Sequence, residues 1–142
     1  MMLKKEALEN ISKSIRGAES NTSGEIRVYI ARHCNDDPLE TAYKKFHQLK
    51  MHKTEQRNGV LIYVSIADHK AAIFGDEGID KTVGDNTFWN EALELMLNYF
   101  KNDDFEPGIT KGVEKVGQLL KEFYPISIDD KNELDNEVII EE

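Results

Sequence analysis

The chain has 142 residues, the length of one ordinary domain. It contains 27 acidic and 18 basic residues, and most of the net charge of −9 lies in residues 126–142, which hold seven acids and one lysine. This balance repels nucleic-acid phosphates and argues against general nucleic-acid binding. We expect one domain over residues 1–125, followed by an acidic, disordered tail over residues 126–142.

Other features of the sequence exclude further classes of protein. Cys34 is the single cysteine, which excludes an internal disulfide bond and a metal site built from several thiolates. No apolar run is long enough to span a membrane. Residues 1–16 mix charged and apolar positions and lack the continuous apolar core of a signal peptide. We therefore expect a cytoplasmic protein.

The first half of the chain predicts a helix, a strand and a second helix. Residues 3–19 carry apolar side chains at helical spacing, and the polar stretch 20–24 ends this helix. Residues 25–31 alternate between Ile or Val and other side chains, which is typical of a half-exposed strand. Asp37 followed by Pro38 then favours a helix start, and the second helix continues to about residue 51.

The second half predicts two strands and two helices. Residues 60–66 are the most apolar run and are rich in β-branched side chains, so a central strand buried on both faces is expected. A four-residue turn leads to a short strand over residues 71–74, which forms an antiparallel hairpin with it. The two remaining helices are expected over residues 86–101 and 107–123.

This order of elements predicts the fold class. A strand, a helix and a buried strand form a right-handed crossover with parallel pairing. A mixed sheet of three or four strands would bury every apolar stripe if helices flanked both of its faces. The expected fold is therefore α/β, a small three-layer αβα sandwich of Rossmann-like type.

Short motifs that occur in a fixed order resemble one known family. They are TSGEIRV (22–28), NGVLIYV (58–64) with DHK (68–70), GDEGI (75–79), FW (88–89) and DDFEPGI (103–109). Together they are similar to the TPM domain, which is named after a thylakoid lumen acid phosphatase, a photosystem II repair protein and a nematode receptor modulator. The resemblance covers about residues 20–125. It implies an αβα fold with a mixed sheet, binding of a divalent cation and, for some members, phosphatase activity on phosphoesters or nucleotides.

Aspartates in the predicted loops are the candidate metal ligands, because Ca²⁺ and Mg²⁺ take oxygen donors. Asp68 follows the second strand, at the carboxyl-end rim where α/β sheets usually bind ligands. A helix over residues 86–101 is about 24 Å long and would return Asp103 and Asp104 to that rim. The preferred cluster is therefore Asp68, Asp103 and Asp104, with Asp36 or Asp37 at its periphery. Asp76 lies on the opposite rim and is a second candidate, supported more by the family resemblance.

No catalytic residue can be assigned from the sequence. Cys34 has His33 beside it, but sequence neighbours on a loop rarely form a catalytic pair, so an inert thiol is expected. Two functions remain open. The first is a domain that binds Ca²⁺ or Mg²⁺ and acts as a metal-dependent phosphatase on a phosphate-bearing small molecule. The second is a non-enzymatic module in which the cation orders loops that recruit a protein partner.

Overall fold

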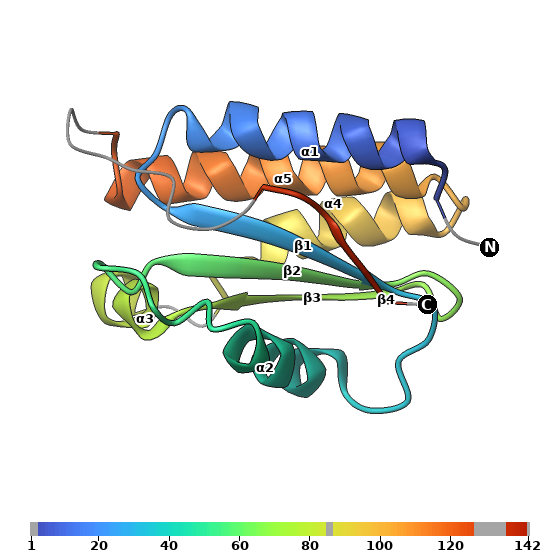
Figure 1. Cartoon of the computed structure of the whole chain (residues 1–142), viewed down its shortest axis with the longest axis horizontal. Helices are drawn as coiled ribbons and strands as arrows, with labels where there is room; N and C mark the ends of the chain where they lie inside the picture. The colour runs from blue at the N-terminus through green and yellow to red at the C-terminus, as the bar shows by residue number, and fades with distance from the viewer. Residues whose placement is uncertain (1–2, 85–86, 127–135, 142) are drawn as a thin grey trace.

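The computed structural model describes residues 3–84, 87–126 and 136–141, which form five helices and four strands (Figure 1). In chain order they are α1 (Lys5–Glu19), β1 (Glu25–Ala31), α2 (Pro38–Gln48), β2 (Gly59–Ser65), β3 (Lys70–Gly75), α3 (Glu77–Val83), α4 (Asn90–Phe100), α5 (Phe105–Phe123) and β4 (Ile139–Glu141).

The four strands form one mixed sheet in the order β3-β2-β1-β4. β1 pairs in parallel with β2, and β2 pairs antiparallel with β3, as the crossover and the hairpin predict. Helices α1, α4 and α5 lie on one face of the sheet and α2 lies on the other (Figure 1). Helix α3 lies at the end of the sheet where β2 begins and β3 ends. The three-layer αβα sandwich is therefore confirmed.

Both faces of the central strands are buried. Val28 and Ile62 pack into the larger core beneath α1, α4 and α5, whereas Tyr29 and Tyr63 pack with Phe46 of α2 on the other face. The alternation in β1 therefore separates two cores, and the prediction of a half-exposed strand is wrong. The cause is α2, which covers the face that carries the less apolar residues.

Two further segments differ from the sequence-based expectation. Residues 77–83 form the short helix α3, where the sequence pattern predicts no helix. Residues 139–141, expected to belong to a disordered tail, form β4 and pair in parallel with the last three residues of β1. The rest of the tail expectation falls largely on residues 127–135, which lie outside the described residues. The predicted start of a helix at residue 86 also lies outside them, and α4 is described from Asn90.

A helix that spans a membrane needs about 20 predominantly apolar residues. None of the described helices combines that length with the necessary apolar character.

Candidate functional site

Asp68 is a carboxylate on the carboxyl-end rim of the sheet that is held by hydrogen bonds. It lies in the turn after β2, and its Oδ2 accepts hydrogen bonds from the Cys34 backbone N–H at 2.6 Å and from the Ser65 hydroxyl at 2.8 Å. The Cys34 N–H, followed by the Ser65 hydroxyl, lowers the pKa of Asp68 below its ordinary value. Asp68 is therefore held ionised between the loops that follow two parallel strands.

The other oxygen of Asp68 has fewer contacts. Asp68 Oδ1 lies 4.0 Å from Nδ1 of His33, whose side chain is largely exposed. That separation exceeds a hydrogen bond, so among the described residues this oxygen has only a long ionic contact. One oxygen of the carboxylate is thus used to fix its position, and the other is available to a ligand.

The neighbouring turn brings Asp103 to the same rim. His69 Nε2 lies 2.7 Å from Asp103 Oδ1, which joins the β2–β3 turn to the α4–α5 turn. Both residues have positive φ angles, 53° for His69 and 60° for Asp103, so each turn is held in the left-handed conformation. Asp68 and Asp103 therefore lie on adjacent turns, as the length of the predicted helix indicates.

Asp104 follows Asp103 in the sequence and lies at the start of α5. It occupies the N-cap position of α5, and its exposed side chain makes no capping hydrogen bond. Together with Asp103 it lines a cleft between the start of α5 and the start of α1, where Lys4 and Glu6 also lie. Asp104 adds negative charge to the rim without being fixed by a hydrogen bond from the helix it begins.

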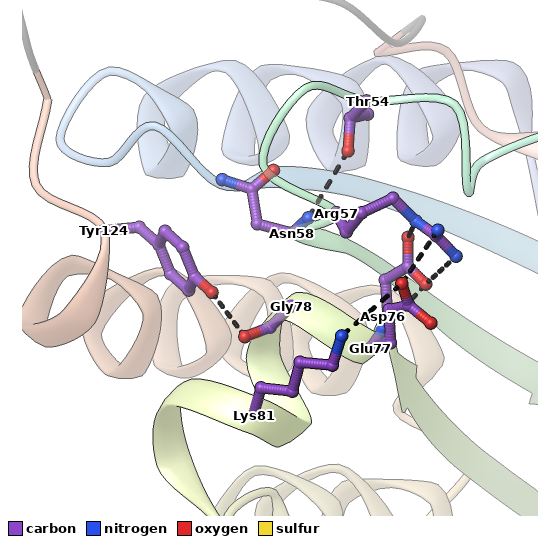
Figure 2. Close-up of polar contacts among 8 residues, drawn as sticks. All are labelled: Thr54, Arg57, Asn58, Asp76, Glu77, Gly78, Lys81 and Tyr124. Carbon is purple, nitrogen blue, oxygen red and sulfur yellow. Dashed lines mark hydrogen bonds and ion pairs between the residues drawn. The ribbon is translucent and has the colours of Figure 1, made fainter.

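Asp76 lies on the opposite, amino-end rim (Figure 2), as the reversal of the third strand predicts. Its side chain is buried and its two oxygens accept hydrogen bonds from Arg57, with Nε at 2.9 Å and Nη2 at 3.1 Å. The same carboxylate accepts the backbone N–H of Glu77 at 2.8 Å and caps α3. These contacts use both oxygens, so the arrangement of Asp76 is that of a structural ion pair.

The surroundings of Asp76 extend this polar network. Nη1 of Arg57 also lies 3.0 Å from Oε1 of Glu77, and Nζ of Lys81 lies 4.0 Å from that same Glu77 oxygen (Figure 2). On the far side of the short helix, the Tyr124 hydroxyl donates to the Gly78 carbonyl at 2.8 Å. The network ties the loop before β2 and the end of α5 to α3.

Two more sequence-based candidates have local structural roles. The Asp37 side chain accepts the backbone N–H of Glu40 at 3.1 Å and caps α2. The Cys34 thiol is buried, with Sγ 3.1 Å from the carbonyl oxygen of Asp36. Both arrangements order the loop that follows β1, next to the amide that holds Asp68.

The sequence interpretation missed the residues that position Asp68. Ser65 lies three residues before it, a spacing at which a hydroxyl can reach a turn carboxylate, and this local pattern could have revealed the contact. The Cys34 amide comes from a loop 34 residues earlier and required the parallel register of β1 and β2. His69 belongs to the DHK motif, but nothing in the sequence indicates that it joins the two turns of the rim.

The donor set on the carboxyl-end rim limits the kind of cation that fits. Among the residues that the structure describes, no three His, Cys, Asp or Glu side chains form a group able to enclose a metal ion. Mg²⁺ keeps several water ligands and commonly binds through one or two carboxylates, and Ca²⁺ also accepts waters. Among the described residues the rim therefore holds no protein-only metal site, and a cation there would need water for most of its ligands.

Comparison with known proteins adds to this geometry. The family model of the TPM domain matches residues 1–119, so the match includes α1, which lies before the motifs recognised in the sequence. No curated protein matches the chain significantly.

Several solved structures share the fold. The NMR structure of the BA42 protein from the psychrophilic bacterium Bizionia argentinensis is 38% identical, with a TM-score of 0.91 over 99% of this chain and 97% of that one. The N-terminal domain of the cg2496 protein from Corynebacterium glutamicum is 12% identical, with a TM-score of 0.66 over 84% and 74% of the two chains. An N-terminal domain from P. gingivalis is 17% identical, with a TM-score of 0.65 over 84% and 77%. The last two likenesses concern the fold alone, whereas the family model covers most of the sequence, and the chain therefore belongs to the TPM domain family.

Proposed function

We propose that this TPM domain binds a hydrated divalent cation, Ca²⁺ or Mg²⁺, on the carboxyl-end rim of its sheet. Asp68 and Asp103 are the protein ligands in this proposal, and Asp104 adds to the negative potential around them. The observation that carries it is the Asp68 carboxylate, which has one oxygen fixed by the Cys34 N–H and the Ser65 hydroxyl, while the other has only the long His33 contact among the described residues.

The electrostatics of the rim support a cation. The hydrogen bonds to Asp68 favour its charged form, so it needs no deprotonation step before it binds a metal ion. A carboxylate held in one orientation also loses less side-chain entropy on binding than a freely rotating one. With two carboxylates and mostly water as ligands, the affinity is expected to lie at the weak end of the range for Ca²⁺ sites, about 10⁻⁴ to 10⁻³ M.

Residue-resolved NMR titration with CaCl₂ and MgCl₂ tests the proposal on the full chain. We expect saturable shifts of the backbone amides of Cys34, Asp68, His69 and Asp103. Asp68→Asn should weaken the affinity at least about tenfold, because it removes the charge of the fixed ligand. Asp36→Asn is the matched control, since this exposed aspartate lies on the same rim and should leave the affinity unchanged. Equal affinity of wild type and Asp68→Asn, or shifts confined to residues 126–142, would contradict the proposal.

Hydrolysis of a phosphoester is a second candidate function, and one observation favours it. The imidazoles of His33 and His69 each lie beside one of the two proposed ligands, at 4.0 Å from Asp68 and 2.7 Å from Asp103. A bound cation would offset the charge of a phosphate and lower the pKa of a bound water. In this candidate function, one of these imidazoles would protonate the leaving oxygen.

An activity assay separates the two candidates. The full chain and its Asp68→Asn and Asp36→Asn variants are assayed with a generic aryl phosphate and with ATP, each with Mg²⁺, with Ca²⁺ and with EDTA. Cation-dependent turnover that is lost only in Asp68→Asn would support the enzyme. If NMR shows cation binding but the assay shows no turnover, the binding function is supported and phosphatase activity is contradicted.

A further inference from the structure

We propose that the outer edge of β1 is a docking groove for an extended peptide that carries two branched apolar residues followed by a carboxylate. In this structure the groove holds β4, the chain's own C-terminal segment, as an exchangeable intramolecular ligand. The occupant to which the proposal commits is a peptide segment of a partner protein with this same chemistry. The proposal concerns a different edge of the molecule from the cation site and does not depend on it.

The first observation is the way in which β4 joins the sheet. Ile139, Ile140 and Glu141 pair in parallel with Tyr29, Ile30 and Ala31, at the outer edge of the sheet beyond β1 (Figure 1). An edge strand presents a row of main-chain donors and acceptors, which an added strand can satisfy whatever its origin. The main-chain contacts thus recognise an extended segment rather than one particular sequence.

The second observation concerns the two isoleucines of β4. Successive side chains of a strand point to opposite faces, so Ile139 packs against the core beside α2 and Ile140 against the core beneath α1 and α5. Both side chains are only partly buried, in contrast to the completely buried residues of β2. A strand added at this edge therefore meets apolar side chains on both faces of the sheet, and this arrangement favours two adjacent branched side chains.

The third observation is an anchor for a carboxylate at the next position. Oε1 of Glu141 accepts the Tyr29 hydroxyl at 2.7 Å and lies 3.1 Å from Nζ of Lys45, which comes from α2. Lys45 also lies over the ring of Tyr29, 5.4 Å from its centroid. These partners favour the ionised carboxylate and lower the pKa of Glu141. The groove thus binds a negatively charged side chain in addition to the two apolar side chains.

The shortness of β4 makes it exchangeable. It has three residues and a single strand neighbour, whereas β2 has seven residues and is paired along both edges. Segments with few buried contacts open at lower free energy than central strands. The apolar contacts on both faces and the Lys45 anchor are supplied by β1, α2 and the cores, so we expect them to remain available to a competing segment when β4 leaves.

Hydrogen exchange in the wild-type chain tests whether β4 opens independently. We expect the protected amides of β4 to exchange at least about 100-fold faster, relative to their intrinsic rates, than the amides of Ile62 and Val64 in β2. Exchange of β4 at the same rate as β2 would show that it opens only with global unfolding, and this result would overturn the proposal.

Binding in trans tests the groove itself. The full-length variant Glu141→Lys places a positive charge against Lys45 and should release β4. The control is Glu122→Lys, which makes the same charge change at an exposed position of α5. An unlabelled peptide with the sequence of residues 136–142 is added to each ¹⁵N-labelled protein. We expect Glu141→Lys to bind the peptide at least about tenfold more tightly than wild type or Glu122→Lys, with shifts at Tyr29, Ile30 and Ala31.

Two further measurements keep the test decisive. If Glu141→Lys does not fold, Glu141→Gln replaces it, since this change removes only the charge and should raise the peptide affinity in the same direction by a smaller factor. A peptide with the same Glu141→Gln change should bind more weakly than the natural one. Three results would each overturn the proposal. The natural peptide could bind all the proteins equally, it could cause shifts outside β1 and α2, or it could fail to bind a folded variant in which β4 is released.

Discussion

The two oxygens of Asp76 are bound by one guanidinium, that of Arg57, with Nε at 2.9 Å and Nη2 at 3.1 Å. Asp76 is 2% exposed, whereas about a third of the Arg57 side chain remains accessible. Two parallel charge-assisted hydrogen bonds of this kind fix the geometry of a carboxylate as well as its charge. The pair joins the loop before β2 to the start of α3, and it gives Asp76 a structural role at this end of the sheet.

Replacing Asp76 by Asn should destabilise the fold. The change removes the charge that Arg57 faces and leaves at least one buried hydrogen bond unsatisfied, so we expect a loss of about 2 kcal/mol in the free energy of unfolding. Urea denaturation measures this loss. Asp80→Asn, at an exposed position of the same helix, is the control and should stay within about 0.5 kcal/mol of wild type. Similar stability of the two variants would contradict a structural role for Asp76.

Gly78 and Gly17 form a matched pair for a test of packing. A Cβ at Gly78 would collide with the backbone of Gln56 and Arg57, whereas nothing lies within 4 Å of a Cβ at Gly17 in α1. We expect Gly78→Ala to cost about 2 kcal/mol or more, because backbone atoms cannot move aside cheaply. Gly17→Ala should instead stabilise the chain by about 0.5 to 1 kcal/mol through helix propensity. Thermal unfolding that shows the same sign for both changes would refute this difference.

The central architecture could be predicted because its signals are local. The apolar run of β2 and the alternation in β1 have the periods of strands, and the stretch between them contains Asp37 and Pro38, which begin α2. The right-handed crossover rule then fixes the parallel pair, and the short turn fixes the antiparallel one. From this topology alone, Asp68 and Asp76 could be assigned to opposite rims, as the structure confirms.

The elements that were missed depend on distant contacts. Helix α3 contains Gly78, Thr82 and Val83, which are weak helix formers, and it is stabilised by the Arg57 pair and by the Tyr124 hydroxyl. Strand β4 has three residues in an acidic segment, and its anchor, Lys45, lies nearly 100 positions earlier in the sequence. No window along the chain contains both partners of such contacts, so sequence pattern could not reveal these elements.

The candidate site was predictable only as a set of loops. Topology brings the β2–β3 turn and the α4–α5 turn to one rim, but it does not indicate which side chains meet there. The contact between His69 and Asp103 depends on positive φ angles at both residues, which neither residue type requires. The position of Asp103 on the rim could therefore be predicted from the sequence, but its contact with His69 could not.

Glu19 should make the stability of the chain depend on pH between about 4.5 and 8. Burial raises its pKa from 4.5 to about 8, and the charge of Glu25 adds to this effect, while the hydrogen bond from the Ile26 amide opposes it. The unfolded chain releases this proton near pH 4.5 and the folded chain near pH 8. The contribution of Glu19 to stability is therefore complete below pH 4.5, falls as the pH rises and reaches its minimum above pH 8.

Urea denaturation at pH 5 and pH 8.5 measures this dependence. We expect wild type to lose about 3 kcal/mol more than Glu19→Gln over this interval, a value below the full linkage because the side chain is partly accessible. Glu9→Gln, which changes an exposed glutamate of the same helix, should retain the wild-type dependence. A Glu19→Gln variant with an unchanged pH dependence would show that another group is responsible.

Asp68 should show the opposite direction of linkage, in a more acidic range. The Cys34 N–H and the Ser65 hydroxyl lower its pKa below 3.8, so its contribution to stability is present above that pH and is lost as the pH falls through the lower value of the folded chain. The Cys34 amide is the direct reporter, because its hydrogen bond weakens when the carboxylate takes up a proton. In ¹H–¹⁵N spectra, that amide should titrate with a midpoint below 3.8 in wild type and in Asp36→Asn, and it should not titrate in Asp68→Asn. A midpoint at or above 3.8 in wild type would mean that the two donors do not hold Asp68 in its charged form, and the preorganised carboxylate on which the cation proposal depends would be absent.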